Sequence, residues 1–294
     1  MTNHIATLAI AGSLLVSTVD AKASVPPSDE GPKATFTLIS DVSHAKPGDV
    51  FWIAVQFKIE PEWHIYWPGQ NDTGIAPIFN WTLPSGWKIG QPRWTAPRRY
   101  ETNSDMLDHV LEGSPVILFP VQIAPDAALG STQQIEADIE WFVCRDVCLA
   151  EFDQASLSLT IAESTVLSPT EARVRAHKAA LPAAWPASDA PIEINRPGAN
   201  SLSVSSSLPG VLSFYPAASG RGVLDIAESC QTRSGTLRIE FASESRAPVV
   251  GIVHFAGDDG SSYAYLYRDP VEPDARRDGF EIRLDTVKQE ASKE

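Results

Sequence analysis

The stretch Trp141-Phe142-Val143-Cys144-Arg145-Asp146-Val147-Cys148 holds two of the three cysteines of this 294-residue chain. Residues 135–143 are rich in β-branched and aromatic side chains, which favour a strand. On one extended strand the two cysteines would lie roughly 13 Å apart, too far for a disulfide. A hairpin with the three-residue loop 145–147 would place them opposite each other and permit the bond.

The role of such a bond is not decided by its spacing. A disulfide that closes a loop of about five residues stabilises the fold by roughly 2 kcal/mol, because it lowers the entropy of the unfolded chain. The corresponding value for a 100-residue loop is about 4.7 kcal/mol. A bond in a tight turn can also exchange with other thiols. The cysteine pair by itself therefore leaves open a redox site, a local structural disulfide and a metal site.

Composition and the first residues limit the partners. The formal net charge of −14 lacks the basic footprint that nucleic acid and anionic lipid require, so no nucleic-acid partner is expected. The apolar run 5–19 and the small residues of Ala21-Lys22-Ala23 predict a signal peptide, residues 1–23, cleaved after Ala23. No later stretch reaches 18 apolar residues, so the exported chain is not expected to be membrane-embedded.

Apolar alternation and turn residues predict an all-β first domain over residues 24–164. A long polar interval, residues 93–113, has little periodicity and is interpreted as a surface loop. Strands at this spacing are typical of an immunoglobulin-like β-sandwich. The predicted strands are residues 34–40, 50–60, 63–67, 78–83, 116–123, 133–144 and 155–162.

Residues 165–190 are predicted to hold one short helix and a linker. Ser168 can cap the helix, Pro169 suits its first position, and Leu181 should end it before Pro182. A second, smaller β-sandwich-like domain is predicted over residues 191–286, followed by a polar tail, 287–294. Its strands are expected at residues 201–206, 211–215, 223–227, 236–241, 249–255, 262–267 and 279–284.

A distant segment adds to the cysteine pair. Trp63-His64-Ile65-Tyr66-Trp67-Pro68-Gly69 and Asp72-Thr73-Gly74-Ile75-Ala76-Pro77 resemble a segment of the DsbD-like periplasmic N-terminal domains, including those of the suppressor-of-copper-sensitivity B proteins. Trp81-Thr82-Leu83-Pro84-Ser85-Gly86-Trp87 matches further along. Cys144 and Cys148 then fall where that family has its redox pair, so the resemblance spans roughly residues 34–162.

The resemblance implies an immunoglobulin-like thiol:disulfide interchange domain in the periplasm that needs no cofactor. By position, Cys148 would form the mixed disulfide with partners and Cys144 would resolve it. The implied partners are thioredoxin-fold periplasmic proteins and a membrane electron-transfer protein. The sequence contains no counterpart of the family's membrane or thioredoxin-like domains, so the electron source is expected to be another protein.

Shielding of the cysteines is a point of difference. The family often covers them with a loop that bears an aromatic residue, whereas the corresponding stretch here, residues 109–113, has none. The candidate shielding residues are Tyr66, Trp67, His109 and Leu111. The aromatic residues near the motif are interpreted as sandwich core rather than as a ligand platform.

The leading hypothesis is a component of protein-disulfide reduction that relays reducing equivalents through Cys144 and Cys148. One alternative is a non-catalytic binding protein with a structural disulfide. Another is a copper-binding or copper-tolerance protein, since two thiolates can bind Cu(I). No tight Cys/His spacing is present, so no metal site is assigned. Cys230 is interpreted as a small buried residue rather than a reactive thiol.

Overall fold

The computed structural model describes residues 31–102, 106–233, 235–243 and 245–269. The predicted signal peptide, the predicted strand 279–284 and the polar tail lie outside these residues. The described part is mostly β, which confirms the predicted fold class. None of its helices is long and apolar enough to cross a membrane.

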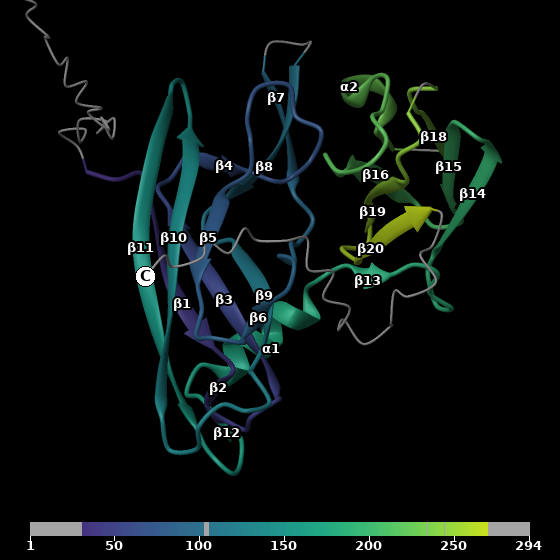
Figure 1. Cartoon of the computed structure of the whole chain (residues 1–294). Helices are drawn as coiled ribbons and strands as arrows, with labels where there is room; N and C mark the ends of the chain where they lie inside the picture. The colour runs from purple at the N-terminus through teal and green to yellow at the C-terminus, as the bar shows by residue number, and fades with distance from the viewer. Residues whose placement is uncertain (1–30, 103–105, 234, 244, 270–294) are drawn as a thin grey trace, which may run out of the picture. The chain divides into compact units, whose positions relative to one another are not determined.

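Two sheets form the first half of the described chain (Figure 1). The first sheet has, in spatial order, strands β1 (Ala34–Ser40), β3 (Val50–Ile59), β9 (Val116–Gln122) and β6 (Lys88–Ile89). The second has the order β12 (Val166–Leu167), β2 (Val42–Ala45), β11 (Cys148–Ile161), β10 (Thr132–Cys144), β4 (His64–Tyr66), β8 (Met106–Glu112) and β7 (Arg98–Thr102), with β5 (Ile78–Thr82) paired to β10.

The core between these sheets follows from the alternation of β10. Every second residue from Ile135 to Val143 is buried, and the intervening side chains are partly or fully exposed. Trp141 on this face packs edge-on against Phe57 of β3, with ring centroids 5.3 Å apart. The predicted strands of the first half are all present, and β11 begins seven residues before the expected start at 155.

The prediction that residues 93–113 form a surface loop was wrong. The described part of this segment contains β7 and β8, and five consecutive residues of β8 are buried. Leu107 and Leu111 of β8 pack into two different cores, one in each half of the chain. Burial on both faces removes the period-2 pattern by which a strand is recognised. The polar Asp108 and His109 between them made the segment look like a loop.

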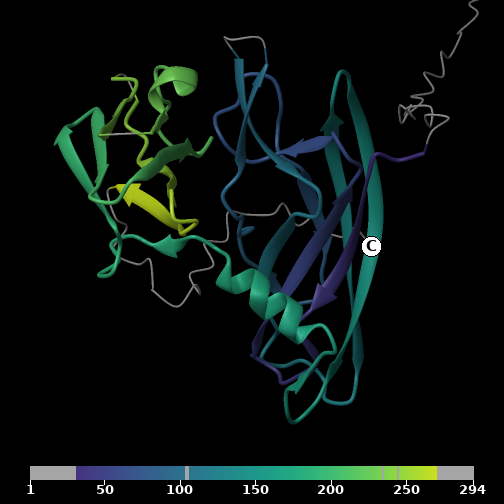
Figure 2. The ribbon, with the colours of Figure 1, turned by 180° about the vertical axis from the view of Figure 1, so that it is seen from behind.

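Helix α1 (Glu171–Ala179) packs on the outside of the first sheet (Figure 2). Its buried Val174 lies against Trp52 of β3 and Leu118 of β9. Ser168 does not cap it as predicted, because the helix begins after Thr170. The Ser168 hydroxyl instead donates to the carbonyl of Ser40 and accepts from the Thr170 amide, so it ties this turn to β1.

The second half of the described chain also has two sheets. One has the order β13 (Ala183–Ala184), β20 (Ser262–Asp269), β19 (Val249–Gly257), β16 (Gly210–Pro216) and β17 (Gln231–Thr232), and the other β14 (Ile192–Gly198), β15 (Ser201–Ser206) and β18 (Thr236–Glu240). They enclose a core of their own around Phe214 and Phe255. The division into two domains stays a prediction, since the described residues from Pro32 onward belong to one compact unit.

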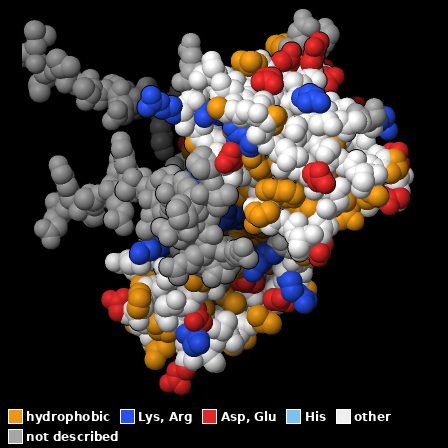
Figure 3. Space-filling view, turned by 90° about the vertical axis from the view of Figure 1, so that its right-hand side faces the viewer, with side chains coloured by type: hydrophobic (Ala, Val, Ile, Leu, Met, Phe, Trp, Pro, Cys, Tyr) orange, Lys and Arg blue, Asp and Glu red, His pale blue; other side chains and the backbone are white. Residues whose placement is uncertain are grey.

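The prediction that residues 223–227 form a strand was also wrong. Val223 makes a single β-bridge with Phe241, and the short helix α2 (Ile226–Ser229) follows. Asp225 caps this helix, because its side chain accepts the Glu228 amide at 2.9 Å. On the face shown in Figure 3, acidic, basic and hydrophobic side chains are interspersed, with no extended basic area.

Candidate functional site

The candidate site is built at the closed end of the β10–β11 hairpin. The two strands pair from Thr132 and Thr160 to Cys144 and Cys148, which lie directly opposite each other. The two cysteines form a disulfide, and the Arg145 amide donates to the Val147 carbonyl at 3.1 Å within the loop. The predicted hairpin, its three-residue loop and the disulfide are therefore confirmed.

The two cysteine residues differ in exposure. Cys144 is 2% exposed, pairs with His64 on β4 and packs against Tyr66 and Val110. Cys148 is an exposed residue at the start of β11, next to Val147, which is 61% exposed. Cys148 is therefore the more accessible residue of the pair, whereas Cys144 is enclosed by residues of the second sheet.

Tyr66 contacts the exposed cysteine directly. Its hydroxyl lies 3.6 Å from the Cys148 Sγ, and its ring is buried. Gly74 lies flat against this ring, since an added Cβ would come within 2.1 Å of two ring carbons. Burial raises the pKa of Tyr66 above its usual range, so the hydroxyl keeps its proton at neutral pH.

The other candidate shielding residues lie in the adjoining core. His109 is buried, and its Nδ1 lies 3.0 Å from the Gln70 carbonyl oxygen. Burial lowers the pKa of His109 to about 4, so the ring is neutral at pH 7. Trp67 lies edge-on to that ring at 6.1 Å, and Leu111 packs with Trp67 in the sandwich core. The shielding role of these residues stays a prediction.

Three site residues were missed by sequence reasoning. Tyr100 on β7 packs against Tyr66 and Cys144, and its ring lies 4.5 Å from that of His64. Thr73 and Asp108 form the hydrogen bonds next to the Tyr66 hydroxyl. Thr73 lies inside the recognised motif and could have been singled out. Tyr100 and Asp108 had no such signal, because both fall in the segment interpreted as a loop.

An open depression of about 580 Å³ lies beside the cysteine loop. Trp63 lines it, and the Arg145 guanidinium lies 5.1 Å from the centre of the Trp63 ring. Arg145 also makes ion pairs with Asp146 at 3.0 Å and with Glu62 at 3.7 Å. The surface beside the disulfide therefore carries both signs of charge and an aromatic face.

Burial lowers the pKa of His64, so this ring is also neutral near pH 7. Among the described residues, no group of three or more His, Cys, Asp or Glu side chains could hold a metal ion. A copper site at this position would thus depend on the two thiolates of the reduced pair, which the soft Cu(I) ion accepts.

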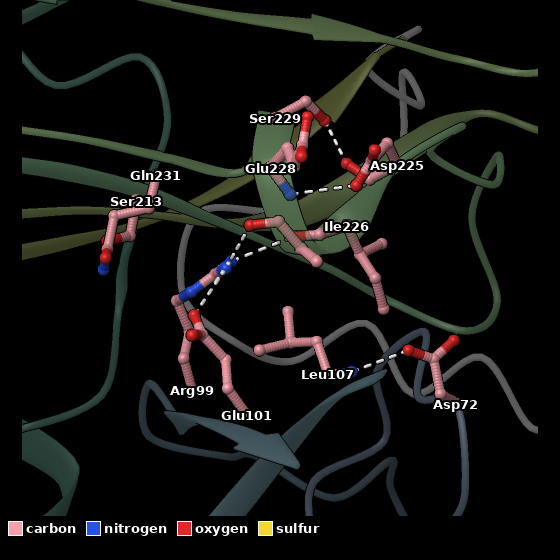
Figure 4. Close-up of polar contacts among 11 residues, drawn as sticks. Asp72, Arg99, Glu101, Leu107, Ser213, Asp225, Ile226, Glu228, Ser229 and Gln231 are labelled. Atoms are coloured by element: carbon pink, nitrogen blue, oxygen red, sulfur yellow. Dashed lines mark hydrogen bonds and ion pairs between the residues drawn. The ribbon is translucent and has the colours of Figure 1, made fainter. Parts of the chain in front are cut away.

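Residues 223–227 bind strand β7 and the loop between β4 and β5. Arg99 points from β7 toward α2, where its guanidinium donates to the carbonyls of Ile226 at 3.0 Å and Ala227 at 2.6 Å (Figure 4). The Gln70 side chain bonds both the amide and the carbonyl of Val223, at 2.7 and 2.8 Å. The segment around Gln70 is thereby joined to the second half of the chain.

Comparison with known proteins identifies related domains. Residues 36–160 match the family described as thiol:disulfide interchange protein DsbD, N-terminal. The crystal structure of the N-terminal periplasmic domain of ScsB from Proteus mirabilis is similar, with 14% identity and a TM-score of 0.50 over 82% of this chain and 95% of that one. No curated protein matched the sequence.

Two structures from Neisseria meningitidis are also similar. The reduced DsbD N-terminal domain has 15% identity and a TM-score of 0.26, over 45% of this chain and 90% of that one. The complex between the DsbD N-terminal and PilB N-terminal domains has 15% identity and a TM-score of 0.25, over 48% and 90%. The family match confirms the resemblance inferred from the tryptophan segment and the cysteine pair.

Proposed function

We propose that this chain exchanges disulfides with other exported proteins through Cys144 and Cys148, because residues 36–160 match the DsbD N-terminal family. The observation that carries the proposal is the unequal exposure of two bonded cysteine residues on one hairpin. The exposed cysteine is the one that a partner thiolate would attack, and the buried one is kept for the second step.

The exchange needs no cofactor. In the dithiol form, the Cys148 thiolate attacks one sulfur of a partner disulfide, and the other partner sulfur leaves as a thiolate that takes up a proton. The Cys144 thiolate then attacks the Cys148 Sγ, which forms the Cys144–Cys148 bond and releases the second partner thiolate. Two electrons pass to the partner, and the same steps in reverse reload the pair from a reduced donor.

We further propose exported thioredoxin-fold proteins as the partners, in the periplasm, with a membrane electron-transfer protein as the electron source. Exposed apolar side chains near Cys148 favour a protein over a small molecule: Val147, Phe142 at 40% exposure and Phe152 at 72% exposure. Phe142 and Phe152 share one face of the hairpin with the disulfide, since their partners across the strands are Ala150 and Glu140.

Single cysteine variants test the assignment of the two roles. Reduced Cys144→Ala protein, mixed with an oxidised thioredoxin-fold protein, should accumulate a mixed disulfide through Cys148, because no second thiol can release it. Cys148→Ala protein should form little or none, since Cys144 is buried. Mass spectrometry of the non-reduced mixture measures both adducts.

Cys230→Ala is the matched control, because Cys230 is fully buried and lies outside the site. It should trap no mixed disulfide and should leave the exchange intact. Equal adduct formation by Cys148→Ala protein, or no adduct with Cys144→Ala protein, would contradict the proposed function.

A further inference from the structure

A line of polar groups, the relay, runs from the exposed Cys148 through Tyr66 and Thr73 to the buried Asp108. The Tyr66 hydroxyl lies 3.6 Å from the Cys148 Sγ and 3.5 Å from the Thr73 Oγ1. The Thr73 hydroxyl lies 2.5 Å from one carboxylate oxygen of Asp108, and the Thr73 amide donates to the other at 3.0 Å. Asp108 is a buried residue, and its carboxylate accepts hydrogen bonds from both the amide and the hydroxyl of Thr73.

The order of these groups sets the direction of each proton. An ionised carboxylate can only accept, so the single Thr73 hydroxyl proton is directed to Asp108. The Thr73 oxygen is then left to accept a hydrogen bond from the Tyr66 hydroxyl. The Tyr66 hydroxyl has one proton, and once this points to Thr73, a lone pair faces Cys148. A lone pair can bond a thiol S–H, but it repels a thiolate.

We propose that Thr73 and Asp108 are positioning residues that turn the Tyr66 hydroxyl into an acceptor toward Cys148 and so keep the reduced cysteine protonated. This inference rests on the proposed function, and it adds a control on when Cys148 reacts. The dithiol would be protected from oxidation in the absence of a partner. A docked partner that displaces Tyr66 from the sulfur would release the thiolate for attack.

The positions of Tyr66 and Thr73 are fixed by the loop between β4 and β5. The Asn71 side chain accepts the His109 amide at 2.8 Å, and the Asp72 side chain accepts the Leu107 amide at 2.7 Å. Both bonds join the loop to β8, the strand that carries Asp108. Gly74 then packs against the Tyr66 ring. The loop on both sides of Thr73 is therefore fixed, by Asn71 and Asp72 before it and by Gly74 after it.

Other charged or titratable groups also lie around the site. They are His64 on β4, Arg98 and Tyr100 on β7, Glu112 on β8, Asp72 in the loop, and Arg145 and Asp146 in the hairpin. Burial keeps His64 neutral at neutral pH and above. Arg98 pairs with Glu112, and Arg145 pairs with Asp146. The buried Asp108 charge acts in the same direction as the relay, since a negative charge disfavours a thiolate.

The test measures the pH profile of Cys148 alkylation by iodoacetamide in the full chain. A Cys144→Ala background leaves Cys148 as the exposed thiol, because Cys230 is buried and burial raises its pKa to about 11. In this background, Thr73→Val should lower the midpoint of the profile by about one pH unit, because the freed Tyr66 proton can turn to the thiolate. Alkylation near pH 7 should become roughly tenfold faster.

Thr73→Ser is the matched control, since it keeps the hydroxyl and should keep the original midpoint. Adding Tyr66→Phe to Thr73→Val should abolish the decrease, because the donor is gone. If Thr73→Val does not fold, Thr73→Ala removes the same hydroxyl and should also lower the midpoint. A midpoint that is unchanged or raised in the Thr73 variant that folds would overturn the relay.

This experiment uses no partner protein, so the two proposals can fail separately. An unchanged alkylation profile with normal mixed-disulfide formation would remove the relay and leave the exchange function in place. A shifted profile without any mixed disulfide would contradict the exchange function and leave the relay.

Discussion

Cys148 and Cys144 are bonded neighbours with different surroundings, and this difference assigns their proposed roles. Cys148 is an exposed residue, and its Sγ lies 3.6 Å from the Tyr66 hydroxyl. Cys144 is enclosed by His64, Tyr66 and Val110. A structural disulfide needs no such asymmetry, whereas a two-step exchange needs one sulfur that partners reach and one that they do not.

His109 makes stability depend on pH. Its pKa is about 4 in the folded protein, against about 6.5 when exposed, so the unfolded chain binds a proton between these values and the folded chain does not. Stability should therefore fall as pH drops from about 6.5 to 4, by up to about 3 kcal/mol from this residue. Urea unfolding at about pH 7 and pH 4.5 measures the loss.

The same measurement on His109→Gln separates this residue from the carboxylates and the other histidines. The variant should lose less stability on acidification than the wild type, whatever its stability at neutral pH. An equal loss in both proteins would show that the buried ring does not supply the pH dependence.

At the scale of single residues, the cysteine pair could be predicted because its spacing permits a disulfide in one backbone geometry. Tyr66 could be predicted because it belongs to a motif. Asp108 could not, since nothing in a single sequence shows that this carboxylate lies buried beside Thr73. That contact joins residues 35 positions apart in the chain.

Strand β8 is the element that sequence reasoning misread, and it is central to the site. Both of its faces are buried: Leu107 and Leu111 pack on one face, and Val110 packs with Tyr66 and Cys144 on the other. Its side chains therefore do not alternate in polarity. Strands β10 and β11 were recognised because one of their faces is exposed. Alternation thus revealed the strands that have one exposed face and hid the strand that carries Asp108 and His109.

The loop between β4 and β5 should tolerate no side chain at Gly74. Gly74→Ala would place a Cβ within 2.1 Å of the Tyr66 ring, so either the loop or the ring must move. We expect a loss of about 1–3 kcal/mol in the free energy of unfolding, measured by urea denaturation. The change should also alter the reactivity of Cys148, because it displaces the Tyr66 hydroxyl.

Gly222→Ala is the matched control. Its Cβ would meet the Gln70 Oε1 at 3.8 Å, which is an ordinary contact. This variant should stay within about 0.5 kcal/mol of the wild type. A Gly74→Ala protein as stable as Gly222→Ala would contradict the close packing of the loop on Tyr66.

At the scale of the molecule, the likeness to the ScsB domain extends beyond the family match. It covers 82% of this chain, whereas the family match ends at residue 160. The strands after α1 therefore belong to the shared fold. Their contacts with Arg99, Gln70 and His109 reach β7, the loop between β4 and β5, and β8. Those contacts could not be predicted, because they join segments more than 100 residues apart.

The central claim is that the Cys144–Cys148 bond cycles between dithiol and disulfide. Equilibration of the whole protein with a glutathione or dithiothreitol redox buffer measures its reduction potential directly, with the two states separated by alkylation and mass spectrometry. We expect a potential above about −300 mV, within the range in which thioredoxin-fold proteins exchange electrons. A potential well below about −300 mV would mark an inert structural bond and would contradict the account.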